Sequence, residues 1–321
     1  MSLKDDVLLT LEKRRGLFVS GQEMADALGV TRAAVNKAVS ALKSGGYEIE
    51  ASTKLGYRIA GDVLSEPGVR AYLPEKYRDI EIIVLRETDS TNNEAKRRLT
   101  AGLNGTALIT AEQQTGGRGR RGRAFSSPPG TGVYITLAVP ADAAISDAVS
   151  STTRAATAAA AALEELTGRE IKIKWVNDLY LDGKKISGIL TEAVSDFETG
   201  VTQTLIIGIG INLKSEGLPE ELRDIAGAID DEKITRCELI GRVAGAILDI
   251  VADLKDKSYI EDYKARSMVL GREVTFSGGG FEAVTGRAID IDGDGGLVVR
   301  LPDGTEKTLR SGEITLRVTG G

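Results

Sequence analysis

The segment 117–123 (GRGRRGR) most restricts how this chain can fold, because it places four arginines within seven residues. No carboxylate stands near them in the sequence, so their charges cannot enter a hydrophobic core. The glycines allow backbone conformations that other residues rarely adopt. The segment lies mid-chain, between the apolar runs Ala107–Ala111 and 133–139. We therefore expect a functional surface loop between two buried strands.

Planar, permanently charged guanidinium groups suit the recognition of carboxylate and phosphate. We expect the loop to bury nothing and to stay mobile until an anion binds. The alternative interpretation is a solvated basic loop, or a segment that touches nucleic acid without sequence preference.

The composition excludes several kinds of chemistry. The 321 residues contain no histidine, which removes Ser-His and Cys-His triads and nearly every zinc site. The single cysteine, Cys237, allows no intrachain disulfide. No apolar run has membrane-spanning length and no signal-peptide pattern is visible, so we expect a cytoplasmic protein of two or three domains that does not bind a membrane.

The first sixty residues predict two helices joined by a tight turn. Ser20 and Glu23 fit a capping box that opens a helix ending at Gly29. Thr31 fits the N-cap of the second helix. Apolar side chains recur on one face of that second helix at Val35, Val39 and Leu42.

Two short stretches that follow, 47–52 and 56–60, fit a β-hairpin or wing. Residues 1–62 are therefore predicted to form a winged helix-turn-helix that binds operator DNA through its second helix and its wing. The candidate DNA-binding residues are Arg32, Asn36, Lys37, Ser40 and Lys54. Residues 1–60 carry 9 Lys+Arg against 7 Asp+Glu, whereas the whole chain has a net charge of −6. The alternative is a purely structural or protein-interaction unit.

After a predicted linker at 61–68, strand and helix signals alternate, which predicts an α/β domain over 66–270. Expected strands lie at 80–85, 107–111, 133–139, 172–178, 179–181, 184–190 and 205–213, and expected helices at 153–166, 238–254 and 259–267. Polar residues 89–92 cluster at a helix N-cap in greater number than capping requires. Residues 271–321 show short strands and glycine turns, which predict a small SH3-like β-barrel. The fold class is α+β and multidomain.

Motifs along nearly the whole chain resemble the biotin protein ligases, specifically the bifunctional type that is also the biotin operon repressor. The resemblance rests on the winged helix, 89–92 (DSTN), Gln114, 117–123 (GRGRRGR), 174–178 (KWVND), 185–188 (KISG), 208–212 (GIGIN) and the C-terminal domain. Val176 stands where proline is common in the family, and Phe125 where tryptophan often lies. Neither difference removes a charge, so activity is still expected.

The resemblance implies a class II synthetase-like catalytic domain and a two-step reaction. Biotin and ATP with Mg²⁺ give biotinyl-5′-adenylate, and a lysine of a biotin carboxyl carrier protein then accepts the biotin. Expected catalytic residues are Lys185, Arg118, Arg120 and Asp178. Expected biotin contacts are Ser90, Thr91, Asn92, Gln114, Arg118, Gly119, Arg120, Lys185, Gly188, Gly208 and Gly210. Expected contacts to ATP or the adenylate are Arg121, Arg123, Phe125, Asn177, Asn212 and Arg317.

The residue types fit this chemistry even without the resemblance. The carboxylate of biotin is ionised at neutral pH, so the first step needs cations rather than a base. Glycines leave room for a flat ring system, and no dedicated metal site is expected. Asp178 either orients or deprotonates the acceptor amine, or it caps a turn after its strand, and both interpretations stay open.

Two other functions remain as alternatives: a ligand-sensing transcription factor without ligase activity, and a lipoate-type acyl ligase. A single helix-turn-helix contacts one half-site, so we expect a homodimer on DNA. Ordering of the arginine-containing loop by biotinyl-adenylate is expected to favour that dimer.

Overall fold

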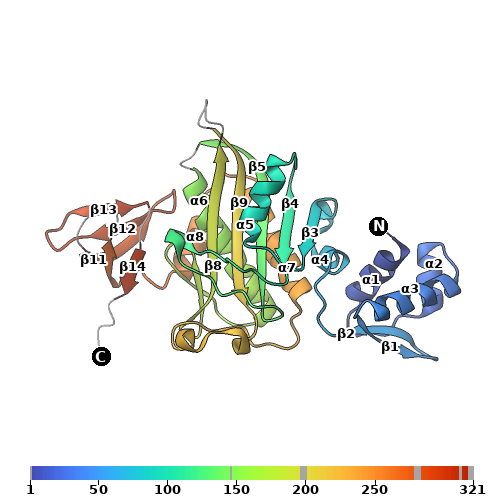
Figure 1. The fold of residues 1–321 in the computed structure, drawn as a ribbon. Coiled ribbons are helices and arrows are strands. Elements are labelled where there is room, and N and C mark those ends of the chain that lie inside the picture. Colours follow the sequence, from blue (N-terminus) through green and yellow to red (C-terminus); the bar gives the residue numbers. More distant parts are fainter. Residues whose placement is uncertain (1, 145–146, 196–200, 278–282, 311–312, 317–321) are drawn as a thin grey trace.

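The computed structural model describes residues 2–144, 147–195, 201–277, 283–310 and 313–316. Three units follow one another along the chain, and the two terminal units lie on opposite sides of the central one (Figure 1). Arg317, predicted to contact ATP, lies outside the described residues.

The N-terminal unit is a winged helix-turn-helix. Its elements are α1 (Leu3–Lys13), α2 (Gly21–Leu28), α3 (Arg32–Ser44), β1 (Glu48–Ser52) and β2 (Gly56–Ala60). The two strands pair antiparallel, and apolar side chains of all three helices form a separate small core. The predicted capping box at Ser20 is wrong in one half: Ser20 accepts from the Gln22 amide, but Glu23 turns away to pair with Arg14. A complete capping box opens α1 instead, at Ser2 and Asp5.

The predicted linker is shorter than expected. Ser65 accepts a hydrogen bond from the Gly68 amide at 3.2 Å and so begins α4 (Glu66–Tyr72) inside it. Arg236, the first residue of α7 (Arg236–Val251), ties the remaining linker to the central unit. Its Nε donates to the Asp62 carboxylate at 3.0 Å and its Nη2 to the Asp62 carbonyl at 2.7 Å, and the guanidinium also pairs with Glu112.

A seven-stranded sheet forms the centre, in the order β3-β4-β5-β9-β8-β7-β6. Its strands are β3 (Glu81–Leu85), β4 (Ala107–Ala111), β5 (Gly132–Ala144), β6 (Lys172–Lys174), β7 (Asp178–Leu181), β8 (Lys184–Ser195) and β9 (Val201–Asn212). Only β3 and β4 run parallel among the described pairs. The predicted hairpin around residues 182–183 is confirmed by the β7–β8 register, which ends at Gly188; from Leu190 to Val194, β8 pairs with β9 alone.

Helices cover both faces of this sheet (Figure 1). The alternation of side chains along β4 shows why: Ala107 and Ile109 pack toward α5 (Thr91–Thr100), while Leu108 joins the main core with α6 (Asp147–Thr167) and α7. The helix α8 (Tyr259–Arg266) lies beside α6. Alanines of α6 allow close packing on the sheet, as the sequence predicted. Short 3₁₀ turns occupy Glu75–Tyr77, Arg120–Gly122, Ser215–Gly217 and Glu220–Leu222.

The C-terminal unit is a five-stranded antiparallel sheet in the order β13-β12-β11-β10-β14. Its strands are β10 (Glu273–Ser277), β11 (Val284–Ile291), β12 (Leu297–Arg300), β13 (Glu306–Leu309) and β14 (Glu313–Leu316). The indole of Trp175 donates to the Gly295 carbonyl at 2.9 Å and so attaches this unit to the central sheet. Trp175 is the only tryptophan of the chain and is 4% exposed.

Candidate active site

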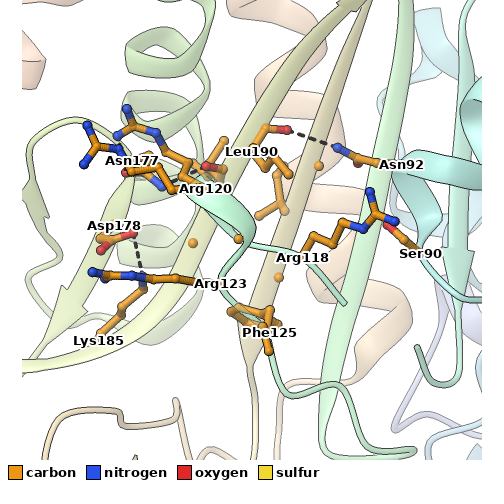
Figure 2. A pocket seen from close by; sticks show the side chains of 18 of the residues that line it. Ser90, Asn92, Arg118, Arg120, Arg123, Phe125, Asn177, Asp178, Lys185 and Leu190 are labelled. Carbon is orange, nitrogen blue, oxygen red and sulfur yellow. Dashed lines mark hydrogen bonds and ion pairs between the residues drawn. The ribbon is translucent and has the colours of Figure 1, made fainter. Parts of the chain in front are cut away.

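A cavity of about 230 Å³ opens on the α5 side of the central sheet. It lies between the start of α5, the arginine-containing loop, strands β8 and β9, and the segment from Lys174 to Asp178 (Figure 2). The C-terminal unit contributes Ile314 to its wall. The predicted biotin contacts all line this cavity: Ser90, Thr91, Asn92, Gln114, Arg118, Gly119, Arg120, Lys185, Gly188, Gly208 and Gly210.

Of the residues predicted to contact ATP, four line the same cavity, namely Arg121, Arg123, Phe125 and Asn177. Asn212 does not; its side-chain amide donates to the Gly227 carbonyl at 2.9 Å, at the end of β9. The structure therefore separates Asn212 from the other predicted contacts.

The arginine-containing loop folds back on itself as a small hairpin. The Gly119 amide donates to the Arg123 carbonyl at 2.7 Å, and the Phe125 amide to the Gly117 carbonyl at 2.9 Å. Gly117 is buried, and a Cβ there would lie 2.4 Å from the Phe125 carbonyl oxygen, so the turn requires glycine. The expectation that this loop buries nothing is therefore wrong at its first residue, whereas Arg123 at its other end is exposed. The side chain of Arg118 stays exposed.

Glycines of β9 make room for two side chains of the site. A Cβ at Gly208 would lie 2.2 Å from Asn92 Oδ1, and one at Gly210 would lie 2.4 Å from the ring of Phe125. Both glycines lie on the α5 face, since they alternate with buried Ile207 along the strand. In this structure the space thus receives Asn92 and Phe125. Room for a ligand ring remains a prediction.

Positive charge dominates the cavity: Arg120, Arg123 and Lys185 lie at the end away from Ser90, whereas Arg118 lies on the same side as Ser90 (Figure 2). Its described lining contains six cationic side chains, Arg118, Arg120, Arg121, Arg123, Lys174 and Lys185, and one carboxylate, that of Asp178. The carboxylate lies 2.7 Å from Lys185 Nζ (Figure 2). Asp178 is the first residue of β7 and directly follows a turn at 175–177, so the single strand predicted at 172–178 is wrong and both interpretations of Asp178 stay open. In a chain of net charge −6, this concentration of cations favours an anionic ligand.

One arginine of the loop reaches across the cavity. Arg120 Nη1 donates to Asn177 Oδ1 at 3.2 Å, and Asn177 Nδ2 donates to the Ile189 carbonyl at 2.9 Å (Figure 2). Asn177 therefore connects the loop to β8. Its contact with Ile189 lies just before the part of β8 that pairs with β9 alone.

Neutral polar groups form the opposite end of the cavity, at the start of α5. Gln114 Oε1 accepts from the Thr91 amide at 2.9 Å, and Gln114 Nε2 donates to Ser127 Oγ at 2.9 Å. Ser90 occupies the N-cap position of α5 but makes no capping hydrogen bond, which leaves its hydroxyl for other contacts. Ser90 and Thr91 are each 3% exposed.

Four residues that the sequence analysis missed support this end: Lys96, Ser127, Thr136 and Glu192. Glu192 Oε2 accepts from Asn92 Nδ2 at 2.8 Å, and Glu192 Oε1 from Lys96 Nζ at 2.6 Å. Burial alone would raise the pKa of Glu192, but the hydrogen bonds from Lys96 and Asn92 outweigh it and lower the pKa. Glu192 is therefore a carboxylate at neutral pH.

A second candidate site lies on the winged helix-turn-helix. All the predicted DNA-binding side chains are exposed: Arg32, Asn36, Lys37 and Ser40 on α3, and Lys54 between the two strands of the wing. A Cβ at Gly21 would lie 3.2 Å from the Tyr57 ring and 3.8 Å from Arg32 Cγ. The start of β2, beside the turn of the wing, therefore lies close to the start of α3.

The described part of the chain contains no helix long and apolar enough to cross a membrane. Nor does it contain a group of three acidic or cysteine side chains placed to hold a metal ion.

The fold and the cavity define a protein ligase of the biotin and lipoate class, joined to a DNA-binding domain. Residues 84–212 match the biotin/lipoate A/B protein ligase family, 4–58 a helix-turn-helix domain, and 269–317 the biotin protein ligase C-terminal domain. The biotin protein ligase of Aquifex aeolicus, solved in complex with biotin and ATP, has 31% identity and a TM-score of 0.62, over 74% of this chain and 98% of that one.

Relatives that match most of the chain show which kind of biotin or lipoate protein ligase it is. The bifunctional ligase/repressor BirA of Bacillus subtilis is 31% identical over 319 residues, which cover 95% of this chain and 96% of the relative. The biotin–[acetyl-CoA-carboxylase] ligase of Paracoccus denitrificans is 33% identical over 70% of this chain and 95% of the relative. The chain belongs to the family of bifunctional biotin ligase/repressors.

Proposed function

We propose that this protein joins biotin to ATP as biotinyl-5′-adenylate, transfers the biotin to a lysine of a biotin carboxyl carrier protein, and represses transcription in response to biotin. One observation carries the proposal. A single cavity combines neutral polar groups at the start of α5 with a lining that holds six cations and one carboxylate, which matches a ligand that carries both a ureido ring and a phosphate.

In the first step, a carboxylate oxygen of biotin attacks the α-phosphorus of ATP, and the bond to pyrophosphate breaks. No proton is removed, because the carboxylate is already ionised. Arg118, Arg120 and Lys185 reduce the repulsion between the two anions and stabilise the charge that develops on the phosphate oxygens. Arg121 and Arg123 contact the departing polyphosphate. The residues Ser90, Thr91 and Gln114 hold the ureido ring.

In the second step, the amine of the acceptor lysine attacks the carbonyl carbon of the mixed anhydride, and the bond to AMP breaks. The nitrogen loses a proton to water as the amide forms, and AMP leaves as the phosphate anion. We assign Asp178 to orient the incoming amine, because it is the only carboxylate in the described lining of the cavity. Its pairing with Lys185 keeps it at the cationic end.

The Mg²⁺ requirement belongs to the same proposal. The described residues offer no cluster of carboxylates, so they fit an ion that enters on the polyphosphate of ATP rather than one held by the protein alone. When bound, Mg²⁺ supplies further positive charge to the phosphates.

Repression requires the winged helix and, by our proposal, a homodimer that forms when biotinyl-adenylate is bound. Two features support it. The free edge of β8 from Leu190 to Val194 can pair with a strand of a second copy. Asn177 connects the arginine-containing loop to Ile189, directly before that edge. A phosphate that orders the loop would thus also act on the edge.

The decisive test mixes the purified protein with biotin, Mg·ATP and a carrier domain, and measures the mass of the carrier. We expect the mass to increase by one biotin, and replacement of the acceptor lysine by arginine should abolish the increase. An unmodified carrier, with operator binding that still responds to biotin, would favour a sensor without ligase activity. Modification by lipoate but not by biotin would favour a lipoate-type ligase.

A further inference from the structure

The hydrogen bonds at the neutral end of the cavity form one directed chain. Glu192 lies at its outer end and Thr91 in the wall of the cavity, with Asn92 and Thr136 between them. Each link fixes which atom donates in the next one. The direction of the chain therefore decides whether Thr91 offers a hydrogen-bond donor or an acceptor to a ligand.

The carboxylate of Glu192 sets the first link. It only accepts, so the NH₂ group of Asn92 must face it, at 2.8 Å. The same NH₂ group faces the Leu190 carbonyl at 3.4 Å (Figure 2). If the amide of Asn92 were rotated by 180°, its oxygen would face the carboxylate and the carbonyl, which repel it. Asn92 Oδ1 therefore points at Thr136.

The next two links follow from the number of protons available. Asn92 Oδ1 carries none, so the hydroxyl of Thr136 donates to it at 2.7 Å. Because the single proton of Thr136 is used in that bond, Thr136 cannot also donate to Thr91 Oγ1, which lies 2.8 Å away. The proton of the Thr91 hydroxyl then goes to Thr136 Oγ1 or to Gln114 Oε1, which lies at 3.2 Å. Thr136 is fully buried, so no water replaces either partner. Thr91 Oγ1 is left with lone pairs only.

The side chain of Gln114, next to Thr91, is fixed so that it offers a hydrogen-bond donor instead of an acceptor. The Ser127 hydroxyl donates to the Phe125 carbonyl at 3.0 Å, so Ser127 Oγ must accept from Gln114 Nε2. Gln114 Oε1 accepts from the Thr91 amide at 2.9 Å and lies 3.2 Å from the Thr91 hydroxyl. One N–H of Gln114 remains. The cavity wall thus offers an acceptor at Thr91 and a donor at Gln114, which complement the N–H and C=O of a cyclic urea.

We propose that Glu192 is a positioning residue that fixes the hydrogen-bond polarity of the ureido site, although it is not among the residues that line the cavity. The inference rests on the proposed function, since it concerns how the same site holds biotin. Lys96, which pairs with Glu192 at 2.6 Å, keeps the carboxylate in place. An amide at position 192 removes the constraint, because it can donate as well as accept, and Asn92 can then rotate.

The test compares Glu192→Gln with Glu94→Gln. The second variant is a matched control, because Glu94 is also an ion-paired glutamate, on α5, but it lies outside this chain of hydrogen bonds. Calorimetry should show biotin binding weakened by about tenfold to a hundredfold in Glu192→Gln, the usual effect of losing a hydrogen bond to a charge. The KM for biotin should rise accordingly, with the KM for ATP and the melting temperature as in the control.

Thr136→Val gives an independent check, because it removes the hydroxyl that transmits the polarity and keeps the side-chain shape. The double variant with Glu192→Gln should bind biotin no more weakly than the weaker single variant. Unchanged biotin affinity in Glu192→Gln, equal losses for biotin and ATP, or additive losses in the double variant would each overturn the inference. A wild-type protein that does not bind biotin would refute the proposed function itself.

Discussion

Replacing Gly208 by alanine should destabilise the central unit through Asn92. The new Cβ would lie 2.2 Å from Oδ1, 2.8 Å from Cγ and 2.9 Å from Nδ2 of that side chain, so the whole amide must move. It cannot move without losing its hydrogen bonds to Thr136 and Glu192. A neutral hydrogen bond contributes about 1 kcal/mol and one to a charge about 1.5–3 kcal/mol. Alanine itself favours a strand by about 0.5–1 kcal/mol. We expect a net loss of about 1.5–3.5 kcal/mol.

The assay uses the fluorescence of Trp175 during urea unfolding of the ligand-free protein. Because this buried side chain is the only tryptophan, its signal follows the central unit and not the winged helix. Gly188→Ala is the matched control: its Cβ would meet nothing closer than Lys185 at 3.5 Å. The control should unfold within about 0.5 kcal/mol of the wild type. Equal free energies of unfolding for the two variants would show that Asn92 is not held as described.

Lys185→Ala should slow adenylate formation about a hundredfold, measured by pyrophosphate release, because one charge at the reacting phosphate contributes about 3 kcal/mol; a wild-type rate would contradict that role. Arg120→Gly should release adenylate, so bystander proteins incubated with it should gain biotin, whereas wild-type levels of labelling with adenylate still formed would argue against retention by the loop. Asn36→Ala should reduce sequence choice on DNA, and Lys54→Ala should weaken binding to all duplexes and lower the salt dependence by about one ion; equal effects of both on specific and nonspecific DNA would contradict this division. Since the pKa of Glu192 is lowered, its carboxylate contributes to stability above the ordinary glutamate value, and the contribution disappears as the pH falls through the lower folded-state value. The difference in unfolding midpoint between wild type and Glu192→Gln should be constant from about pH 8 to pH 5 and shrink below about pH 4, and a difference that grows on acidification would refute the sign.

The elements with local signals were predictable from the sequence. Thr31 caps α3, the hairpin at 182–183 joins β7 to β8, and the glycine-rich strand β9 is buried, as expected. The start of α4 was missed because Ser65 lies in a stretch whose glycines and proline also fit a linker. The start of α6 at residue 147 was placed too late, because its alanines begin further along the chain.

The supporting part of the site could not be predicted in this way. Glu192 lies 100 positions from Asn92, and Thr136 lies 44 positions from it, so no spacing or periodicity connects them. Both look like ordinary strand residues. Only the sheet order, which brings β5, β9 and β8 side by side under α5, reveals that they share a network. Gln114 and Lys185 were recognisable because they stand in motifs of the family that the chain resembles, and both line the cavity.

The attachment of the C-terminal unit has a consequence for how the enzyme comes into existence in the cell. Ile314 belongs to the last described strand, yet it completes a cavity whose other walls come from residues 90–210. The indole N–H of Trp175 likewise donates to the carbonyl of Gly295, a residue of the C-terminal unit. On a translating ribosome, the winged helix and the central sheet emerge first, with the cavity open on one side. We therefore expect biotin activation to begin only after the last β domain has folded, so that an unfinished chain forms little reactive adenylate.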